Sequence, residues 1–315
     1  MPSGFVNFNH AVAQNAAGVN PNINMSMPKF IAGGLGFATV AFTALQLHAQ
    51  PAIPDENKVN GFAIGCQAYT FNKFTAFEAI EKTAKAGGKV IEFYPGQTLS
   101  KEESSLKVDH NSPQVDDVVA KLQAKLKQHG VKAVNYGVVG IAKDEAGARK
   151  VFEFAKKMGM RAVTTESDDA INTIEKLVKE YDIAVGYHNH PGSMSKPDYK
   201  VWSPYYIAGL VAGRDSRIGA AADTGHWQTC GLKPVECLRV LKGHLVSVHL
   251  KDKKAFGPSH DVPYSEGVGD MKACLDELKA QGFNGNISIE YEYNWDNNVP
   301  EVTKCIDFVR NYGGQ

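Results

Sequence analysis

The sequence has few of the features that mark a disulfide framework, a thiolate metal site or a nucleic-acid partner. Only five cysteines occur in 315 residues, and no two of them have the Cys-x-x-Cys spacing of zinc and redox motifs. Lysine plus arginine equals aspartate plus glutamate, at 34 each. No excess of positive charge therefore predicts binding to nucleic acid or to an acidic membrane surface. We expect most of the cysteines to be small core residues.

A glycine-rich nucleotide-binding turn is also absent after the first apolar run, which argues against a doubly wound open sheet. From Gly61 onward, short β-rich runs alternate with amphipathic stretches, and eight β-then-α units predict a closed parallel (β/α)₈ TIM barrel. No linker divides the barrel, so we expect one domain over residues 53–315. The expected strands are 62–69, 89–94, 131–136 with an extension to 141, 161–166, 183–188, 218–223, 245–249 and 287–290.

Helix signals separate these expected strands. The apolar stripe of Phe77, Ile80 and Ala84 stops at Gly87–Gly88, a glycine signal for a helix end. Aspartates are good helix caps, and we expect Asp168 to cap the helix after the fourth strand. Asp270 is expected to cap the helix that contains Leu275 and Leu278, in preference to binding a metal.

A single long apolar run stands near the N-terminus. Residues 30–47 have no charged side chain, Lys29 precedes them and Ala49 follows them, which is the pattern of a signal peptide. The sequence therefore predicts a leader and signal peptide over residues 1–52, and an exported protein, periplasmic or secreted. The run is also about long enough to span a bilayer, so membrane anchoring by residues 30–47 is the alternative.

Three further expectations concern this N-terminal region. Signal peptides rarely follow a polar leader of this length, so translation from Met25 or Met27 is an alternative to translation from Met1. The mature chain is expected to start between Gln50 and Ile53. Residues before Phe62 have no apolar pattern that could pack, and we expect them to be poorly ordered.

Side chains of the kinds that bind metals stand at or near the ends of several expected strands. In a barrel, the C-terminal strand ends meet on one face, where sites are built. Carboxylates gathered there would repel one another, so a divalent cation is the natural partner. Mixed carboxylate and imidazole ligands suit Mn²⁺, Co²⁺, Zn²⁺ or Mg²⁺. The residues are Glu92, Glu166, His188, Asp223, His249 and Glu290.

The motifs around these residues resemble the xylose-isomerase-like barrel superfamily, which holds sugar phosphate isomerases, epimerases and inosose dehydratases. The segments 222–227, 248–252 and 288–292 resemble its last three strand motifs. The segment 187–190 is similar to the fifth strand of the inosose-dehydratase-like branch, and 260–270 resembles the loop after the seventh strand. The resemblance covers roughly residues 61–313 and implies a TIM barrel that acts on sugars.

The resemblance further implies one divalent metal ion held by a Glu, an Asp, a His and a second Glu from the last four strands. Asp223, His249 and Glu290 match that pattern. The fifth strand has His188 where many members have Glu, so the fourth ligand is either His188 or Glu166 from the neighbouring strand. Epimerases of this family typically transfer protons with two opposed carboxylates. A histidine in place of the fifth-strand glutamate therefore argues against a simple epimerisation of that kind.

Roles in chemistry can be assigned to the neighbours of these ligands. Glu290 is the first candidate for the base that removes a proton next to a carbonyl. His190 and His226 follow proposed ligands by two and three residues, so they shuttle protons or hold substrate hydroxyls; the alternative is that they orient a ligand. Lys251 is expected to neutralise a developing oxyanion or, alternatively, to pair with Asp252.

Aromatic and acidic residues at the expected barrel rim are candidates for substrate contacts. Glu92, Tyr94 and Trp227, together with Tyr69, are expected to form sugar-binding walls or, equally, to pack at the rim. The partner is then a small-molecule sugar or keto-sugar and not a nucleic acid, and a homo-oligomer is left open.

We expect a metal-dependent sugar isomerase or epimerase that works through an enediolate. A keto-sugar or inosose lyase or dehydratase on the same barrel is the alternative. Less favoured are a catalytically silent sugar-binding barrel and a relative of the apurinic-site endonucleases of this superfamily. Neutral charge and export argue against the endonuclease.

Overall fold

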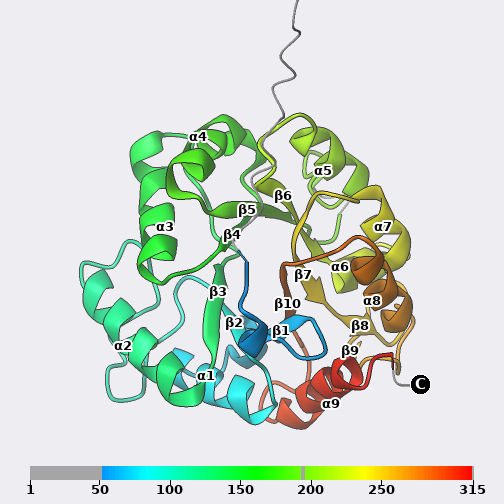
Figure 1. Ribbon diagram of the computed structural model, residues 1–315, viewed down its shortest axis with the longest axis horizontal. Helices are drawn as coiled ribbons and strands as arrows, with labels where there is room; N and C mark the ends of the chain where they lie inside the picture. The colour runs from blue at the N-terminus through cyan, green and yellow to red at the C-terminus, as the bar shows by residue number, and fades with distance from the viewer. Residues whose placement is uncertain (1–51, 193–195, 314–315) are drawn as a thin grey trace, which may run out of the picture. The chain divides into compact units, whose positions relative to one another are not determined.

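Eight parallel strands close into a barrel in the computed structural model, which describes residues 52–192 and 196–313 (Figure 1). Around the barrel the strands follow the order β1-β10-β7-β6-β5-β4-β3-β2. Successive barrel strands along the chain therefore lie side by side, and the pairing of β1 with β10 closes the barrel. Nearly every strand residue is buried, as expected for a parallel sheet covered by helices. The strands are β1 (Ala63–Gln67), β2 (Val90–Phe93), β3 (Lys132–Tyr136), β4 (Ala162–Thr165), β5 (Ala184–His188), β6 (Ile218–Asp223), β7 (Leu245–Leu250) and β10 (Asn286–Ile289).

Helices ring the barrel and confirm the predicted (β/α)₈ architecture. The sequence did not predict α5, α6, α7 or the small hairpin of β8 (Asp252–Lys253) and β9 (Asp261–Val262). The helices are α1 (Ala76–Lys85), α2 (Val115–His129), α3 (Glu145–Lys157), α4 (Ile171–Tyr181), α5 (Pro204–Val211), α6 (Thr224–Thr229), α7 (Pro234–Val240), α8 (Met271–Ala280) and α9 (Val299–Arg310), with 3₁₀ turns η1 (Asp55–Asn57), η2 (Ala68–Phe71) and η3 (Asp168–Ala170).

Two local predictions at strand and helix ends were wrong. Strand β3 stops at Tyr136 and does not extend to residue 141, because the chain turns at Gly137 to line the barrel mouth. Asp168 does not cap α4, whose N-cap is Ala170; the Asp168 carboxylate instead accepts a hydrogen bond from the Tyr206 hydroxyl at 2.6 Å. The cap on α8 is confirmed, since Asp270 accepts from the amide of Ala273.

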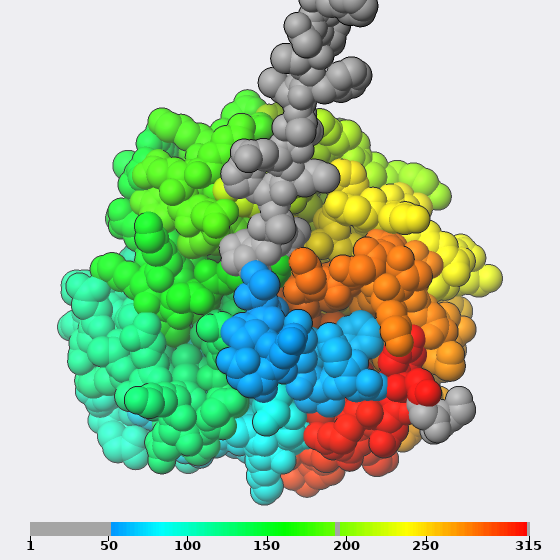
Figure 2. Space-filling view, viewed as in Figure 1, coloured from blue at the N-terminus to red at the C-terminus, as the bar shows by residue number. Residues whose placement is uncertain are grey.

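The described segment before β1, which begins at residue 52, packs against the barrel through Ile53, so the expectation that residues before Phe62 would be poorly ordered is wrong for this part. Residues 1–51 lie outside the described residues, and the expectation for them stays a prediction. Ile53 is only 3% exposed and forms an apolar cluster with Ala63, Val90 and Val134 at the N-terminal ends of the strands. In Figure 2 this blue segment lies over the near end of the barrel. The sequence did not predict this packing because a single apolar residue, Ile53, gives no periodic pattern. Its side chain nevertheless covers the N-terminal end of the barrel, and we call it the plug. The predicted signal run, 30–47, lies outside the described residues.

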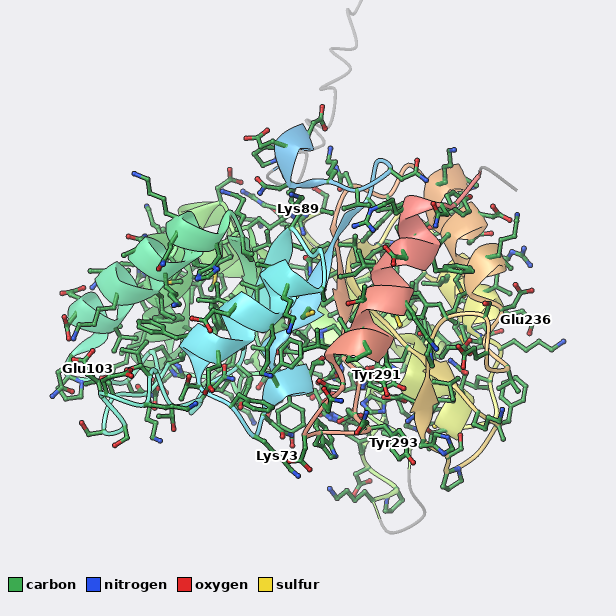
Figure 3. The ribbon with its side chains drawn as sticks, turned by 90° about the horizontal axis from the view of Figure 1, so that it is seen from below. Lys73, Lys89, Glu103, Glu236, Tyr291 and Tyr293 are labelled. Atoms are coloured by element: carbon green, nitrogen blue, oxygen red, sulfur yellow. The ribbon has the colours of Figure 1, made fainter. Side chains whose placement is uncertain are left out.

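The two ends of the barrel therefore differ in what covers them. In Figure 3, Lys89, just before β2, lies on the side of η1, whereas Lys73 and Tyr293, which follow β1 and β10, lie at the opposite end. The C-terminal strand ends thus meet away from the plug, where the sequence placed the site.

The burial of the cysteines matches the sequence-based expectation. All five cysteines are free, and four of them are buried, as expected for core residues. Within 52–192 and 196–313, no helix has the length and apolar character needed to cross a membrane.

Candidate functional site

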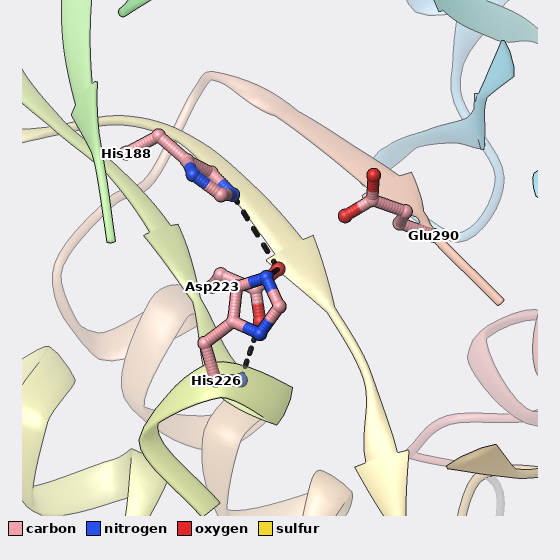
Figure 4. Close-up of side chains that lie close together, drawn as sticks. All are labelled: His188, Asp223, His226 and Glu290. Carbon is pink, nitrogen blue, oxygen red and sulfur yellow. Dashed lines mark hydrogen bonds and ion pairs between the residues drawn. The ribbon is translucent and has the colours of Figure 1, made fainter. Parts of the chain in front are cut away.

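Four buried side chains converge at the C-terminal end of the barrel, each from a different place in the fold (Figure 4). His188 ends β5, Asp223 ends β6, His226 lies in the first turn of α6 and Glu290 follows β10. One donor atom of each lies within 4.8 Å of one donor atom of every other. Asp223 also caps α6: its Oδ1 accepts from the His226 amide at 2.8 Å, so its Oδ2 faces the centre. Local helix capping thus fixes the orientation of a candidate ligand.

His188 has its two ring nitrogens in different surroundings. Its Nδ1 lies 3.0 Å from Oε1 of Glu166, and its Nε2 lies 3.5 Å from Oδ2 of Asp223. Nε2 is buried and has no hydrogen-bond partner among the described residues. An imidazole that donates from Nδ1 to a carboxylate presents the Nε2 lone pair, which is the usual arrangement of a metal-bound histidine. His188 therefore has the geometry of a ligand, and Glu166 lies behind it.

His249 is held in a similar way from the other side. Its Nε2 lies 3.0 Å from Oε2 of Glu92, while its Nδ1 lies 3.2 Å from Oε2 of Glu290 and 3.7 Å from Oδ2 of Asp223. Ser288 donates a further hydrogen bond to the same oxygen of Glu92. Glu92 is fully buried behind His249 and does not line the pocket described below, so it orients this imidazole.

Lys251 places a buried cation among the carboxylates. Its Nζ lies 3.1 Å from Oδ2 of Asp223, 2.7 Å from Oε2 of Glu290 and 3.0 Å from Oε2 of Glu292. The alternative of a Lys251–Asp252 ion pair is wrong. The Asp252 carboxylate instead accepts hydrogen bonds from the backbone amides of Ser265, Gly267 and Gly269.

These charges decide the protonation states at the centre. Burial acts to raise the pKa of Asp223, but the charges of His226 and Lys251 hold it well below its usual value. Burial likewise opposes ionisation of Glu290, and Lys251 and His249 again lower its pKa well below the ordinary range. For Glu166, burial is outweighed by hydrogen bonds from His188 and His190, which lower its pKa to about 2. Carboxylates outnumber the single lysine, so the centre favours an additional cation.

A cavity of about 230 Å³ opens directly above this centre. His190, half exposed, lines it, and its Nδ1 is hydrogen-bonded to Glu166 Oε1, so one carboxylate holds two imidazoles. Glu290 belongs both to the buried cluster and to the cavity wall, which brings a carboxylate and an imidazole to the same space. The lining residues are Gln67, Tyr69, Tyr94, Pro95, Gly137, Val138, His190, Glu290 and Glu292.

The structure separates the residues expected to contact substrate. Tyr94 lines the cavity, whereas Trp227 is fully buried and its indole N–H donates to the Trp202 carbonyl. Sequence reasoning missed Glu292 and Gln67 as cavity residues. A signal for Glu292 was present, because it stands two residues after Glu290 in a strand-like run, where alternate side chains share a face.

Comparison with known proteins agrees with this architecture. The model of the xylose isomerase-like TIM barrel family matches residues 80–312. A solved structure of an uncharacterised protein from Parabacteroides distasonis is 30% identical, covering 80% of this chain and 99% of that chain with a TM-score of 0.63. A D-tagatose 3-epimerase-like protein is 17% identical, with coverages of 79% and 96% and a TM-score of 0.61. A protein from Bacillus anthracis assigned as the 3-DHS dehydratase AsbF is 13% identical, with coverages of 78% and 98% and a TM-score of 0.56. These last two likenesses show the fold.

Curated relatives match over a shorter stretch. The L-ribulose-5-phosphate 3-epimerase UlaE of Salmonella paratyphi A is 39% identical over 74 residues, which is 23% of this chain and 26% of that protein. The match spans about a quarter of the relative's length. The family model, by contrast, covers most of the barrel, and the chain belongs to the xylose isomerase-like TIM barrel family.

Proposed function

We propose that this protein is a metal-dependent sugar isomerase or epimerase that removes a proton from the carbon next to a carbonyl. The observation that carries the proposal is the place of Glu290, which lines the cavity and also stands in the buried cluster. The family supports it, because relatives of this chain include a ribulose-phosphate epimerase and a D-tagatose epimerase-like fold.

The residues present fit a divalent ion. His188 Nε2 is a buried nitrogen without a hydrogen-bond partner, and it faces carboxylate oxygens of Asp223 and Glu290. We propose these three as ligands together with His249, while His226 lies close enough to bind either the ion or a substrate hydroxyl. When bound, the ion polarises the carbonyl and the adjacent hydroxyl of the sugar.

Proton transfer then falls to side chains on the cavity wall. Glu290 is ionised because Lys251 and His249 lower its pKa, so its carboxylate can accept the proton from the acidified carbon. His190 also lines the cavity, and the bond from its Nδ1 to Glu166 leaves Nε2 available to exchange a proton with the substrate. Lys251 stabilises negative charge that develops beside Glu290.

A lyase or dehydratase acting on a keto-sugar is the second candidate. The observation that favours it is the unlike pair on the cavity wall, a carboxylate at Glu290 and an imidazole at His190. Such a pair suits removal of a proton by the carboxylate and protonation of a leaving hydroxyl or alkoxide by the imidazole. The fold likeness to AsbF is consistent with this candidate.

The decisive experiment follows solvent deuterium. Purified protein supplied with Mn²⁺ is incubated in D₂O with a panel of ketoses, aldoses and inososes. We expect deuterium at one carbon, with the substrate rearranged by an isomerase or stripped of a substituent by a lyase. Glu290→Gln is expected to lower the exchange rate by a factor of about 10² or more. Glu236→Gln, a change at a largely solvent-exposed glutamate outside the cavity, is the control expected to retain it. Exchange into none of the sugars would overturn the proposal.

A further inference from the structure

A second hollow adjoins the catalytic cavity on the outer side of Tyr94. It has a volume of about 460 Å³ and lies between the loops that follow β1 and β2. Tyr94 lines both spaces, so they are neighbours at the same end of the barrel. The residues that matter here are Asn72, Lys73, Gln97, Thr98, Lys101 and Ser104.

The sizes of the two spaces differ in a way that bears on the substrate. Ligand sites in proteins usually measure roughly 300–1,000 Å³. The catalytic cavity, at about 230 Å³, is smaller than that and suits a single small ring. Together with the hollow it reaches the ordinary range, so the combined site has room for a sugar that carries a large substituent.

Charge in the hollow indicates what kind of substituent would fit. Lys73 Nζ lies 2.9 Å from both carboxylate oxygens of Asp296, and Lys101 Nζ lies 2.5 Å from Glu78. A phosphate group in the hollow would have to compete with these two carboxylates for the two lysines. The rest of the lining consists mainly of neutral amides and hydroxyls, which suit a neutral group rich in hydroxyls.

Aromatic rings stand where the two spaces meet. Tyr69 packs edge-on against Tyr94 with ring centroids 5.2 Å apart, and against Trp295 at 5.9 Å. Tyr69 is 39% exposed, so part of this aromatic surface faces solvent. Aromatic rings with a polar tip combine apolar contact area with a hydrogen-bonding group, and a sugar ring offers both in return. In the hollow, buried Gln97 also has an amide oxygen without a hydrogen-bond partner among the described residues.

We propose that the hollow is a second sugar subsite, and that the substrate is a glycoside: the reacting sugar unit occupies the cavity above the buried cluster, and a second, uncharged sugar unit occupies the hollow beyond Tyr94. The inference rests on the proposed function, because it names the substrate class of the same site.

Equilibrium binding tests the subsite without relying on turnover. Calorimetry on the full chain compares D-fructose with disaccharides that end in fructose (lactulose, maltulose, isomaltulose and turanose) and with fructose 6-phosphate. The disaccharides add a hexose at different hydroxyls of the same ketose. We expect at least one of them to bind about tenfold more tightly than D-fructose, and fructose 6-phosphate to show no such gain.

A pair of adjacent serines supplies the matched variants. Ser104 and Ser105 are both exposed, but only Ser104 lines the hollow. Ser104→Trp should fill the hollow and remove the gain in affinity for the disaccharide, whereas Ser105→Trp should preserve it. Disaccharides that bind no more tightly than D-fructose, equal effects of the two variants, or tightest binding of the phosphate would each overturn the inference. A disaccharide that binds as expected but exchanges no deuterium would refute the proposed chemistry and leave the subsite standing.

Discussion

Nε2 of His188 and Oδ2 of Asp223 face each other at 3.5 Å between the ends of the neighbouring strands β5 and β6, with no hydrogen bond between the nitrogen and any described residue. The other ring nitrogen of His188 is occupied by Glu166 at 3.0 Å. The sequence left open whether His188 or Glu166 is the fourth metal ligand. The surroundings of the two ring nitrogens favour His188 as the ligand and Glu166 as the carboxylate that orients it.

The ranking of two variants tests that assignment. His188→Ala removes a donor atom from the centre, whereas Glu166→Ala removes only the carboxylate behind it, which typically costs 10–100-fold in metal affinity. We therefore expect the dissociation constant for Mn²⁺ or Zn²⁺ to rise further in His188→Ala than in Glu166→Ala. Competition with a chromogenic chelator measures both. A larger loss in Glu166→Ala would transfer the ligand role to Glu166.

Metal binding should release protons. Burial opposes protonation of His188, but Asp223 and Glu166 raise its pKa above 6.5. The pKa of His249 is raised well above 6.5 by Glu92 and Glu290 against the same effect of burial. A raised pKa means that each ring is protonated below that value, so the ion must displace a proton and its affinity falls as the pH falls through it.

The number of protons displaced distinguishes the two histidines. Near pH 6 we expect about two protons released per ion bound, from His188 and His249, and about one in His188→Ala. Calorimetry in buffers of different ionisation enthalpy gives the count. Binding that releases no proton and does not change with pH would contradict the ligand roles of both imidazoles.

The plug at the N-terminal end of the barrel should stabilise the fold. Ile53 is 3% exposed against Ala63, Val90 and Val134, so Ile53→Ala is expected to lower the free energy of unfolding by about 2 kcal/mol or more. Urea unfolding measures the change. Glu56→Ala, at an exposed position of η1, serves as the control and should change the free energy by less than about 0.5 kcal/mol. Equal stability of Ile53→Ala and the unaltered protein would show that the plug contributes nothing.

We propose that the protein is exported and that its mature chain begins between Gln50 and Ile53. The uncharged run 30–47 after Lys29 supports this proposal, and a start at these positions retains the Ile53 plug. N-terminal sequencing of the native protein, with fractionation of the cells, measures it. A cytoplasmic chain that begins at Met1 would refute export, and an intact run 30–47 in the membrane fraction would identify an anchor.

Periodicity and strand-end chemistry were enough to predict the barrel and most of the centre. The sixth strand was predicted with the observed bounds, Ile218–Asp223, because its small apolar residues end abruptly at a charged one. Short elements such as α6 were not predicted, because six residues are too few to show a helical period. The lysine at position 251 could be placed at the site, but only tertiary packing shows that its partners are Asp223, Glu290 and Glu292 and not its neighbour Asp252.

The directions in which the strand-end side chains point could not be predicted from the sequence. Both Glu92 and Glu166 stood at strand ends and appeared equivalent to the ligands. In the fold each lies behind a histidine, at positions that depend on the register of neighbouring strands. Ile53 was missed for a related reason: one apolar residue has no period, and its value comes from the barrel end that it covers.

The metal content of the purified protein tests the central claim most directly. Elemental analysis of the unaltered chain is expected to give about one divalent ion per molecule, because the two groups of candidate donors share His188. Asp223→Ala and His249→Ala should each lose the ion together with deuterium exchange into the sugar. Full occupancy in both variants, or an unaltered protein that exchanges deuterium at full rate after chelation of all metal, would contradict the account.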